Sequence, residues 1–169
     1  TDAGSLQTVT RAFRTARNLN LPLVLHVTGT RPFAVDASLA IRDLALNHRP
    51  ATVGLLSGSC ASDHLDLMAT DVIVAAPDLT LSASRPTPYS ATEARQSGIV
   101  DLIANDDLDA QLAKEITRIG RLTPARRLDL RHRTMDQRGS ETGAAVEAAR
   151  VELLDLHEIR DHLRKSMED

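Results

Sequence analysis

Apolar residues recur at helical spacing in some segments of the chain and form short continuous runs in others. Residues 5–18 carry Leu6, Val9 and Phe13 on one helical face, which predicts an amphipathic helix. Continuous apolar runs at residues 21–28 and 51–56 are typical of strands buried on both faces. A second helix is expected between them, over residues 37–47, with Pro50 closing it. Strands that alternate with helices in this way favour a parallel sheet with right-handed crossovers.

Shorter elements follow in the middle of the chain. Gly58-Ser59-Cys60 predicts a turn, residues 63–69 a helix, and residues 72–75 and 79–82 two short strands. Ser90 and Glu93 form the pattern of a capping box, which predicts a helix that begins there and ends at Gly98. Residues 99–103 then predict a strand.

From Asp107 onward the pattern is helical to the end of the chain. Leu112, Ile116 and Ile119 share one face, and another helical stretch is expected from Thr142. These patterns divide the chain into an α/β core over residues 1–104 and a helical region over residues 105–169. The helical region is expected to serve as a lid or in oligomerisation.

Composition excludes several classes of function. With 20 basic and 23 acidic residues the net charge is −3, and the aromatic residues are only Phe13, Phe33 and Tyr89. Nucleic acid is therefore not an expected partner, because neither a basic field nor a stacking platform is available. The single Cys60 excludes an internal disulfide, and no Cys and His spacing fits a metal site, so a cytoplasmic location is expected. Neither a membrane span nor an export signal is expected from the apolar runs or the first residues.

Three segments carry a likeness to a known family. Residues 33–39 (FAVDASL) match in part the pattern Phe-x-x-Gly-x-Asp-Leu. Residues 53–71 stand in the places of a pattern of strand, Asn-Gly, Gly-Gly-Gly turn and apolar-Cys-Asp, with Ser57-Gly58 for Asn-Gly and with Ser62 and Asp63 replacing glycines. Residues 89–103 (YSATEARQSGIVDLI) are similar to a third family segment. On these motifs the chain, over residues 7–121, resembles the crotonase (enoyl-CoA hydratase/isomerase) superfamily as a divergent or shortened member. The resemblance implies a crotonase-like (Clp/crotonase) ββα superhelix core with a helical C-terminal region.

The resemblance also implies a chemistry. Members bind an acyl thioester on coenzyme A or on the phosphopantetheine of an acyl-carrier protein, and two main-chain N–H groups form an oxyanion hole for its carbonyl oxygen. By alignment these donors are the amides of Ala37 and Ser62. The expected reactions are dehydration, decarboxylation or isomerisation through an enolate, in a polyketide-type or other specialised pathway. No metal or redox cofactor is implied, and a homotrimer or hexamer is expected.

The acid and base residues of the family's hydratases are absent. Leu65 and the pair Ser84-Arg85 stand where the family carries glutamates, so ordinary enoyl-CoA hydration is not expected. Asp63, His64 and Asp66 lie within a turn of the proposed donors and are the candidate catalytic residues. Each also has a structural interpretation, because Asp63 can stabilise a helix N-terminus and the other two can be exposed helix residues.

Other polar residues favour structural roles. His26, inside an apolar strand, is interpreted as a hydrogen-bonded core or edge histidine, and Glu152 and His157 as part of a solvated helix face. Residues 58–62 have the spacing of the nucleophile turn in Clp proteases, which would make Ser62 a nucleophile. However, residues 85–88 read Arg-Pro-Thr-Pro where that chemistry needs a histidine base.

A non-catalytic function stays open beside the enzymatic one. The substituted glycines and missing glutamates are also compatible with a catalytically degenerate homologue that acts as an accessory or scaffold subunit of a biosynthetic complex.

Overall fold

A computed structural model describes residues 2–31, 34–62, 64, 69–82, 87–104 and 107–138. The first part of the chain alternates helices and strands: α1 (Asp2–Asn18), β1 (Leu23–Gly29), α2 (Val35–Leu46) and β2 (Thr52–Ala61). Short elements follow: β3 (Val72–Ala75), β4 (Thr80–Ser82), β5 (Tyr89–Ser90), α3 (Ala91–Gln96) and β6 (Leu102–Ile103). Two longer helices complete the described part: α4 (Leu108–Gly120) and α5 (Pro124–Arg138).

The sheet is built around β2. β1 pairs with β2 along one side, while β3 pairs with the first half of β2 on the other side and β4 with the second half. β6 extends the sheet beyond β3, and β5 extends it beyond β4. Every pair is parallel except β4 with β5, so the predicted parallel sheet is confirmed.

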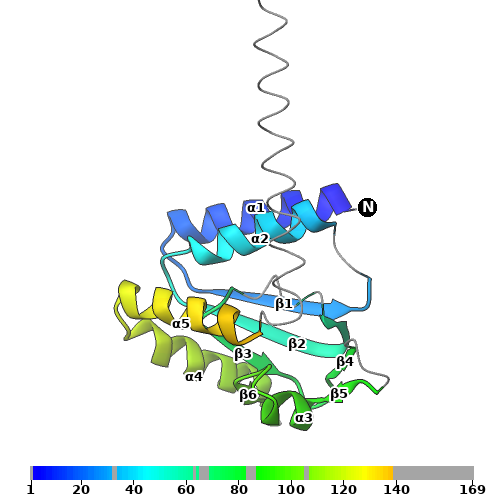
Figure 1. The fold of residues 1–169 in the computed structure, drawn as a ribbon. Coiled ribbons are helices and arrows are strands. Elements are labelled where there is room, and N and C mark those ends of the chain that lie inside the picture. Colours follow the sequence, from blue (N-terminus) through cyan, green and yellow to red (C-terminus); the bar gives the residue numbers. More distant parts are fainter. Residues whose placement is uncertain are drawn as a thin grey trace, which may run out of the picture.

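Helices cover both faces of the sheet (Figure 1). α1 and α2 lie on one face, where Ile41 of α2 packs in one core with Leu25, Val27 and Leu56. α4 covers the opposite face, where its apolar stripe packs on β2 and β3; this second core comprises Ala51, Val53, Leu55, Val72, Val74, Ala104, Leu112 and Ile119. The strand-then-helix order thus produces a three-layer arrangement around one sheet.

One prediction for β1 is wrong. The apolar run at residues 21–28 was expected to be buried on both faces, but only Leu25 and Val27 are buried, whereas Val24, His26 and Thr28 are exposed. The reason is that α4 packs over β2 and β3, not over β1. One face of β1 therefore stays open in the described part of the chain.

The predicted turn at Gly58-Ser59-Cys60 is also wrong, because these residues lie inside β2. Gly58 has φ of 61°, a left-handed conformation that glycine adopts without strain. The register with β1 shifts at this point, where Gly29 pairs with Cys60. The glycine signal therefore marks an irregularity in a continuing strand, as is typical of a bulge.

The capping box is confirmed at α3. The Ser90 hydroxyl accepts from the Glu93 N–H at 3.3 Å, and the Ser90 N–H donates to the Glu93 carboxylate at 2.8 Å. The strand expected at residues 99–103 is reduced to Leu102 and Ile103, because the N–H of Ile99 donates back to Ala94 at the end of the helix at 2.9 Å.

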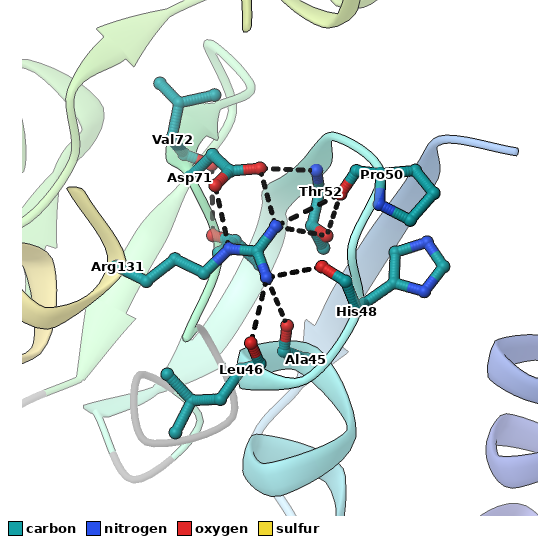
Figure 2. Close-up of polar contacts among 9 residues, drawn as sticks. Ala45, Leu46, His48, Pro50, Thr52, Asp71, Val72 and Arg131 are labelled. Atoms are coloured by element: carbon teal, nitrogen blue, oxygen red, sulfur yellow. Dashed lines mark hydrogen bonds and ion pairs between the residues drawn. The ribbon is translucent and has the colours of Figure 1, made fainter. Parts of the chain in front are cut away.

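α5 is held to the sheet by one buried arginine (Figure 2). Nε of Arg131 donates to Asp71 at 2.7 Å and Nη2 donates to the second oxygen of that carboxylate at 3.0 Å. Nη1 donates to the carbonyl oxygens of Ala45, Leu46 and His48 at 2.8, 3.1 and 2.6 Å. These carbonyls lie at the end of α2 and just beyond it, so Arg131 caps α2 from another helix.

Asp71 completes this arrangement at the start of β3. Its second oxygen also accepts from the N–H of Thr52 at 2.7 Å, and Nη2 of Arg131 donates to Pro50 at 3.1 Å. Asp71 occupies the place of the aspartate in the family's apolar-Cys-Asp segment. A single ion pair therefore joins α5, the end of α2 and the starts of β2 and β3.

Candidate functional site

The carboxyl ends of β1 and β2 lie side by side. Gly29 pairs with Cys60, and the Cys60 thiol donates to the carbonyl of Val27 at 3.4 Å. Each strand leads into a turn, which begins at Thr30 after β1 and at Ser62 after β2. Because both turns leave the same end of a parallel sheet, this edge is the expected place for a ligand in an α/β fold.

A buried histidine joins the two turns. His64, 1% exposed, donates from Nε2 to the carbonyl of Arg31 at 2.7 Å. The described structure thus gives His64, one of the candidate catalytic residues, a contact that positions one turn against the other. Its proposed part in acid or base chemistry stays a prediction.

The first proposed oxyanion donor lies at the beginning of α2. Ala37 is in the first turn of that helix, where main-chain N–H groups have no partner inside the helix. Its N–H donates to the neighbouring Asp36 carboxylate at 2.9 Å. Asp36 is exposed, so a ligand atom that takes this amide must displace a surface carboxylate rather than a buried one.

The second turn is described only in part. Ser62, the other proposed donor, and His64 lie in it, whereas the candidates Asp63 and Asp66 fall outside the described residues. The positions that replace the family's glutamates, Leu65 and Ser84-Arg85, also fall outside them, as do Glu152 and His157. The helix expected over residues 63–69 and the helical stretch from Thr142 cannot be compared for the same reason.

His26 lies on the open face of β1, as the interpretation of an edge histidine predicted. Its Nε2 and the Ser57 hydroxyl of β2 share a hydrogen bond of 2.7 Å. The two described histidines nearest this end of the sheet thus contact Ser57 and Arg31.

A cleft of about 1010 Å³ opens at the other end of the molecule, between α1 and α2. Three arginines line it, Arg14, Arg17 and Arg49, together with buried His48. Both helices end there (Figure 1), so the negative ends of their dipoles already attract these cations. The helix dipoles therefore compensate part of the positive charge of these arginines.

The surroundings of His48 in this cleft disfavour protonation of its imidazole ring. Burial lowers the pKa of His48, and although the hydrogen bond to the Leu21 carbonyl at 3.0 Å raises it, the nearby charge of Arg131 lowers it further. His48 also packs edge-on against Phe13. These contacts favour the neutral form of His48 and a structural role for it.

The sequence analysis did not predict the buried charges of the described residues, which are Arg42, Asp71, Glu115 and Arg131. Arg42, on α2, is 8% exposed. For Arg42 a signal was available, since it precedes the apolar residues Ala45 and Leu46 on one stripe of α2, a position at which a charge is uncommon.

Two kinds of feature are absent from the described part of the chain. Among those residues no group of three or more His, Cys, Asp or Glu side chains converges as metal ligands would. Within the same ranges no helix has the length and apolar content that crossing a bilayer requires.

Comparison with known proteins identifies the fold. No protein-family model and no curated protein matches the sequence. A probable enoyl-CoA hydratase from Mycobacterium thermoresistibile superposes with a TM-score of 0.61 at 19% identity, over 85% of this chain and 81% of the other. A putative polyketide biosynthesis enoyl-CoA hydratase from Bacillus subtilis superposes with a TM-score of 0.56 at 14% identity, over 85% and 78%.

A different group of proteins shares the same arrangement. A ClpP1 mutant from Listeria monocytogenes superposes with a TM-score of 0.54 at 13% identity, over 62% of this chain and 86% of the other. Enoyl-CoA hydratases and ClpP-like proteins are thus both similar in fold to this chain. The chain therefore has the Clp/crotonase fold, which confirms the resemblance seen in its sequence at the level of the fold.

Proposed function

We propose that this protein binds an acyl thioester, carried on coenzyme A or on an acyl-carrier protein, at the carboxyl ends of β1 and β2. The amides of Ala37 and Ser62 are the proposed donors to the thioester oxygen. The observation that carries the proposal is the contact between His64 and Arg31, which holds the turns bearing these donors against each other. The crotonase fold supports the same position for the ligand.

The proposed reaction proceeds through an enolate. Two main-chain donors stabilise the negative charge that develops on the thioester oxygen, and each such donor contributes roughly 3–4 kcal/mol to the transition state. Because Leu65 and Ser84-Arg85 stand where the family carries glutamates, ordinary addition of water is not proposed, and dehydration, decarboxylation and isomerisation remain the proposed reactions. Asp63, His64 and Asp66 remain the candidates for the acid and the base. The similarity to a putative polyketide biosynthesis hydratase supports a specialised biosynthetic pathway.

Binding tests this proposal directly. Acetyl- and butyryl-pantetheine, titrated to millimolar concentration, are expected to shift amide resonances at the two turns and to leave those of the α1–α2 cleft unchanged. His64→Ala should weaken binding, because it releases the turn after β2 from Arg31. Matched His132→Ala removes an exposed histidine on α5 and should have no effect. Absence of any shift with every thioester would refute the site.

A second function is favoured by one contact. The Asp36 carboxylate already accepts from the Ala37 amide, which suits a degenerate homologue that supports a partner enzyme. Mass spectrometry of a panel of acyl-CoA thioesters, with and without a neighbouring pathway enzyme, distinguishes the two. If parent and Asp63→Ala protein are equally inert while the activity of the partner enzyme rises, the accessory function is correct.

The proposed assembly is a homo-oligomer, a trimer or hexamer. Light scattering coupled to size exclusion measures it, and a mass equal to that of the 18.3 kDa chain would contradict it.

A further inference from the structure

A serine and a histidine form a hydrogen-bonded pair on the open face of β1. The Ser57 hydroxyl and Nε2 of His26 lie 2.7 Å apart, and the two residues come from adjacent strands that pair in parallel. His26 is exposed and Ser57 is half-buried. In the described part of the chain α4 packs over β2 and β3 and leaves this face of β1 uncovered, so the pair is accessible to solvent.

The geometry of this pair is that of an activated nucleophile. A serine hydroxyl is a weak nucleophile unless a base accepts its proton, and a base that does so lies within about 2.6–3.2 Å of it. Nε2 of a neutral imidazole can accept this proton when Nδ1 carries the ring hydrogen. His48 and His64 use Nε2 to contact main-chain carbonyl oxygens, which have no proton to give. His26 differs from them because its partner is a hydroxyl, which can donate to it.

The backbone of β2 is irregular at the serine. The register with β1 shifts at this point, so that residues 57–59 of β2 lie opposite the single Thr28 of β1. Gly58 has φ of 61° within this stretch. Bulges are common next to active sites, where they re-aim a side chain that a regular strand would hold elsewhere. The irregularity therefore sets the direction of Ser57 relative to the neighbouring strand.

Thr28 supplies a third polar group beside the pair. It is exposed, it lies two residues after His26 on β1, and its Oγ1 is 3.4 Å from the position that a Cβ on Gly58 would occupy. Because Gly58 has no side chain, the space between the Thr28 hydroxyl and the residue that follows Ser57 stays open. A hydroxyl in this place can donate to a carbonyl oxygen on which negative charge develops.

We propose that Ser57 is a nucleophile, with His26 as its general base, and that it takes the acyl group of a small ester or thioester. Ser57 Oγ bonds to the carbonyl carbon while its proton passes to Nε2 of His26, and the Thr28 hydroxyl donates to the carbonyl oxygen. The bond from that carbon to the leaving oxygen or sulfur then breaks, and the leaving group takes the proton from His26. The products are an acyl ester of Ser57 and a free alcohol or thiol. This step is separate from the enolate chemistry proposed above and uses neither Ala37 nor Ser62.

Acylation of the full chain tests the inference. The parent protein is incubated with p-nitrophenyl acetate or with acetyl-pantetheine, and intact mass and peptide mapping locate the transferred acetyl group. Release of p-nitrophenol or of the free thiol is followed in parallel, so that rapid hydrolysis of the acyl ester is also detected. We expect one acetyl group on Ser57, and the donor that reacts faster identifies the preferred leaving group. Acetylation confined to other side chains overturns the inference.

Variants assign the two roles. Ser57→Ala should abolish the specific acetylation, His26→Gln should slow it at least about 100-fold, and Thr28→Val should slow it at least about tenfold. Ser59→Ala removes an exposed serine two residues along β2, and His132→Gln an exposed histidine on α5; both should react at the rate of the parent. If His26→Gln also reacts at the rate of the parent, Ser57 has no base and the inference is wrong.

Two further measurements separate this site from misfolding and from the thioester site. Ser57→Cys keeps a nucleophile at the same position and should still be acetylated, whereas loss of reaction in both the alanine and the cysteine variants contradicts the proposed site. Ser57→Ala should leave the amide shifts that acetyl-pantetheine causes at the two turns unchanged. Failure of acylation therefore overturns this inference alone, and absence of those shifts overturns the proposed function alone.

Discussion

Two buried arginines of this fold have opposite surroundings, and the difference determines what each can do. Arg131 donates to a carboxylate and to carbonyl oxygens of the connection from α2 to β2, so its charge is compensated within the protein. Arg42 has no such acceptors among the described residues. Burial alone therefore does not show whether a cation is paired within the protein, and the acceptors around it must be compared.

Removing Arg131 should be among the most destabilising single changes in this chain. Arg131→Ala leaves the Asp71 carboxylate buried without its partner and uncaps α2, so we expect the free energy of unfolding to fall by about 3–5 kcal/mol. Arg126→Ala, an exposed arginine on the same helix, should change it by less than about 0.5 kcal/mol. Urea denaturation measures both, and similar values for the two variants would contradict the role of the ion pair.

His48 should make stability depend on pH. Because burial lowers its pKa below the ordinary 6.5, the unfolded chain takes up a proton at a pH where the native protein does not. The unfolded state therefore binds more protons below about pH 6.5, and the free energy of unfolding falls as the pH decreases through that value. Above about pH 6.5 the contribution of His48 to stability is fully present.

The pH dependence of the free energy of unfolding tests this prediction. His48→Gln should flatten the curve between pH 5 and pH 7, whereas His132→Gln, at an exposed position on α5, should leave it as in the parent. A slope that persists in the His48 variant would show that another group is responsible.

At the scale of elements, two glycines should respond oppositely to the same change. Gly58→Ala places a side chain at φ of 61° and 3.4 Å from the Thr28 hydroxyl, so we expect a loss of about 1–2 kcal/mol. Gly120, at the end of α4, has an ordinary helical conformation with nothing within 4 Å of an added carbon. Gly120→Ala should therefore raise stability by about 0.5–1 kcal/mol. Thermal unfolding of both variants tests this difference. A gain in stability for Gly58→Ala would contradict the left-handed conformation and the strand irregularity at that position.

Local sequence signals predicted those elements whose chemistry is local. The capping box of α3 and the alternation of helices with strands depend on neighbouring residues, and both predictions are confirmed. The extent of β2 and the exposure of β1 depend on partners distant in sequence. A glycine such as Gly58 indicates a positive φ without showing whether the chain turns or continues, and only the pairing with β1 decides that.

At the scale of the whole molecule, the fold was easier to predict than the site. Motif patterns indicated which turns approach each other, and the contact of His64 with Arg31 places them together. They did not indicate that Asp36 would accept from the Ala37 amide or that Arg42 would be buried without an anion. Such features depend on the balance of charges among several elements, which a single sequence does not show.

Cys60 can report how firmly the whole sheet is held. The thiol is fully buried in β2, and burial raises its pKa, so it is both shielded and poorly nucleophilic in the native state. We expect a thiol reagent at pH 8 to label it at least about 10³-fold more slowly than in urea, because labelling requires unfolding. Ser59→Cys adds an exposed thiol one residue away and should label at once.

The same reagent connects α5 to the centre of the sheet. If the ion pair between Arg131 and Asp71 secures β2 and β3 together, Arg131→Ala must accelerate Cys60 labelling by the factor that its loss of stability predicts, more than about 100-fold for 3 kcal/mol. An unchanged labelling rate in a destabilised variant would mean that α5 detaches while the sheet stays closed. The fold would then consist of a core and a separately unfolding helix rather than one cooperative unit.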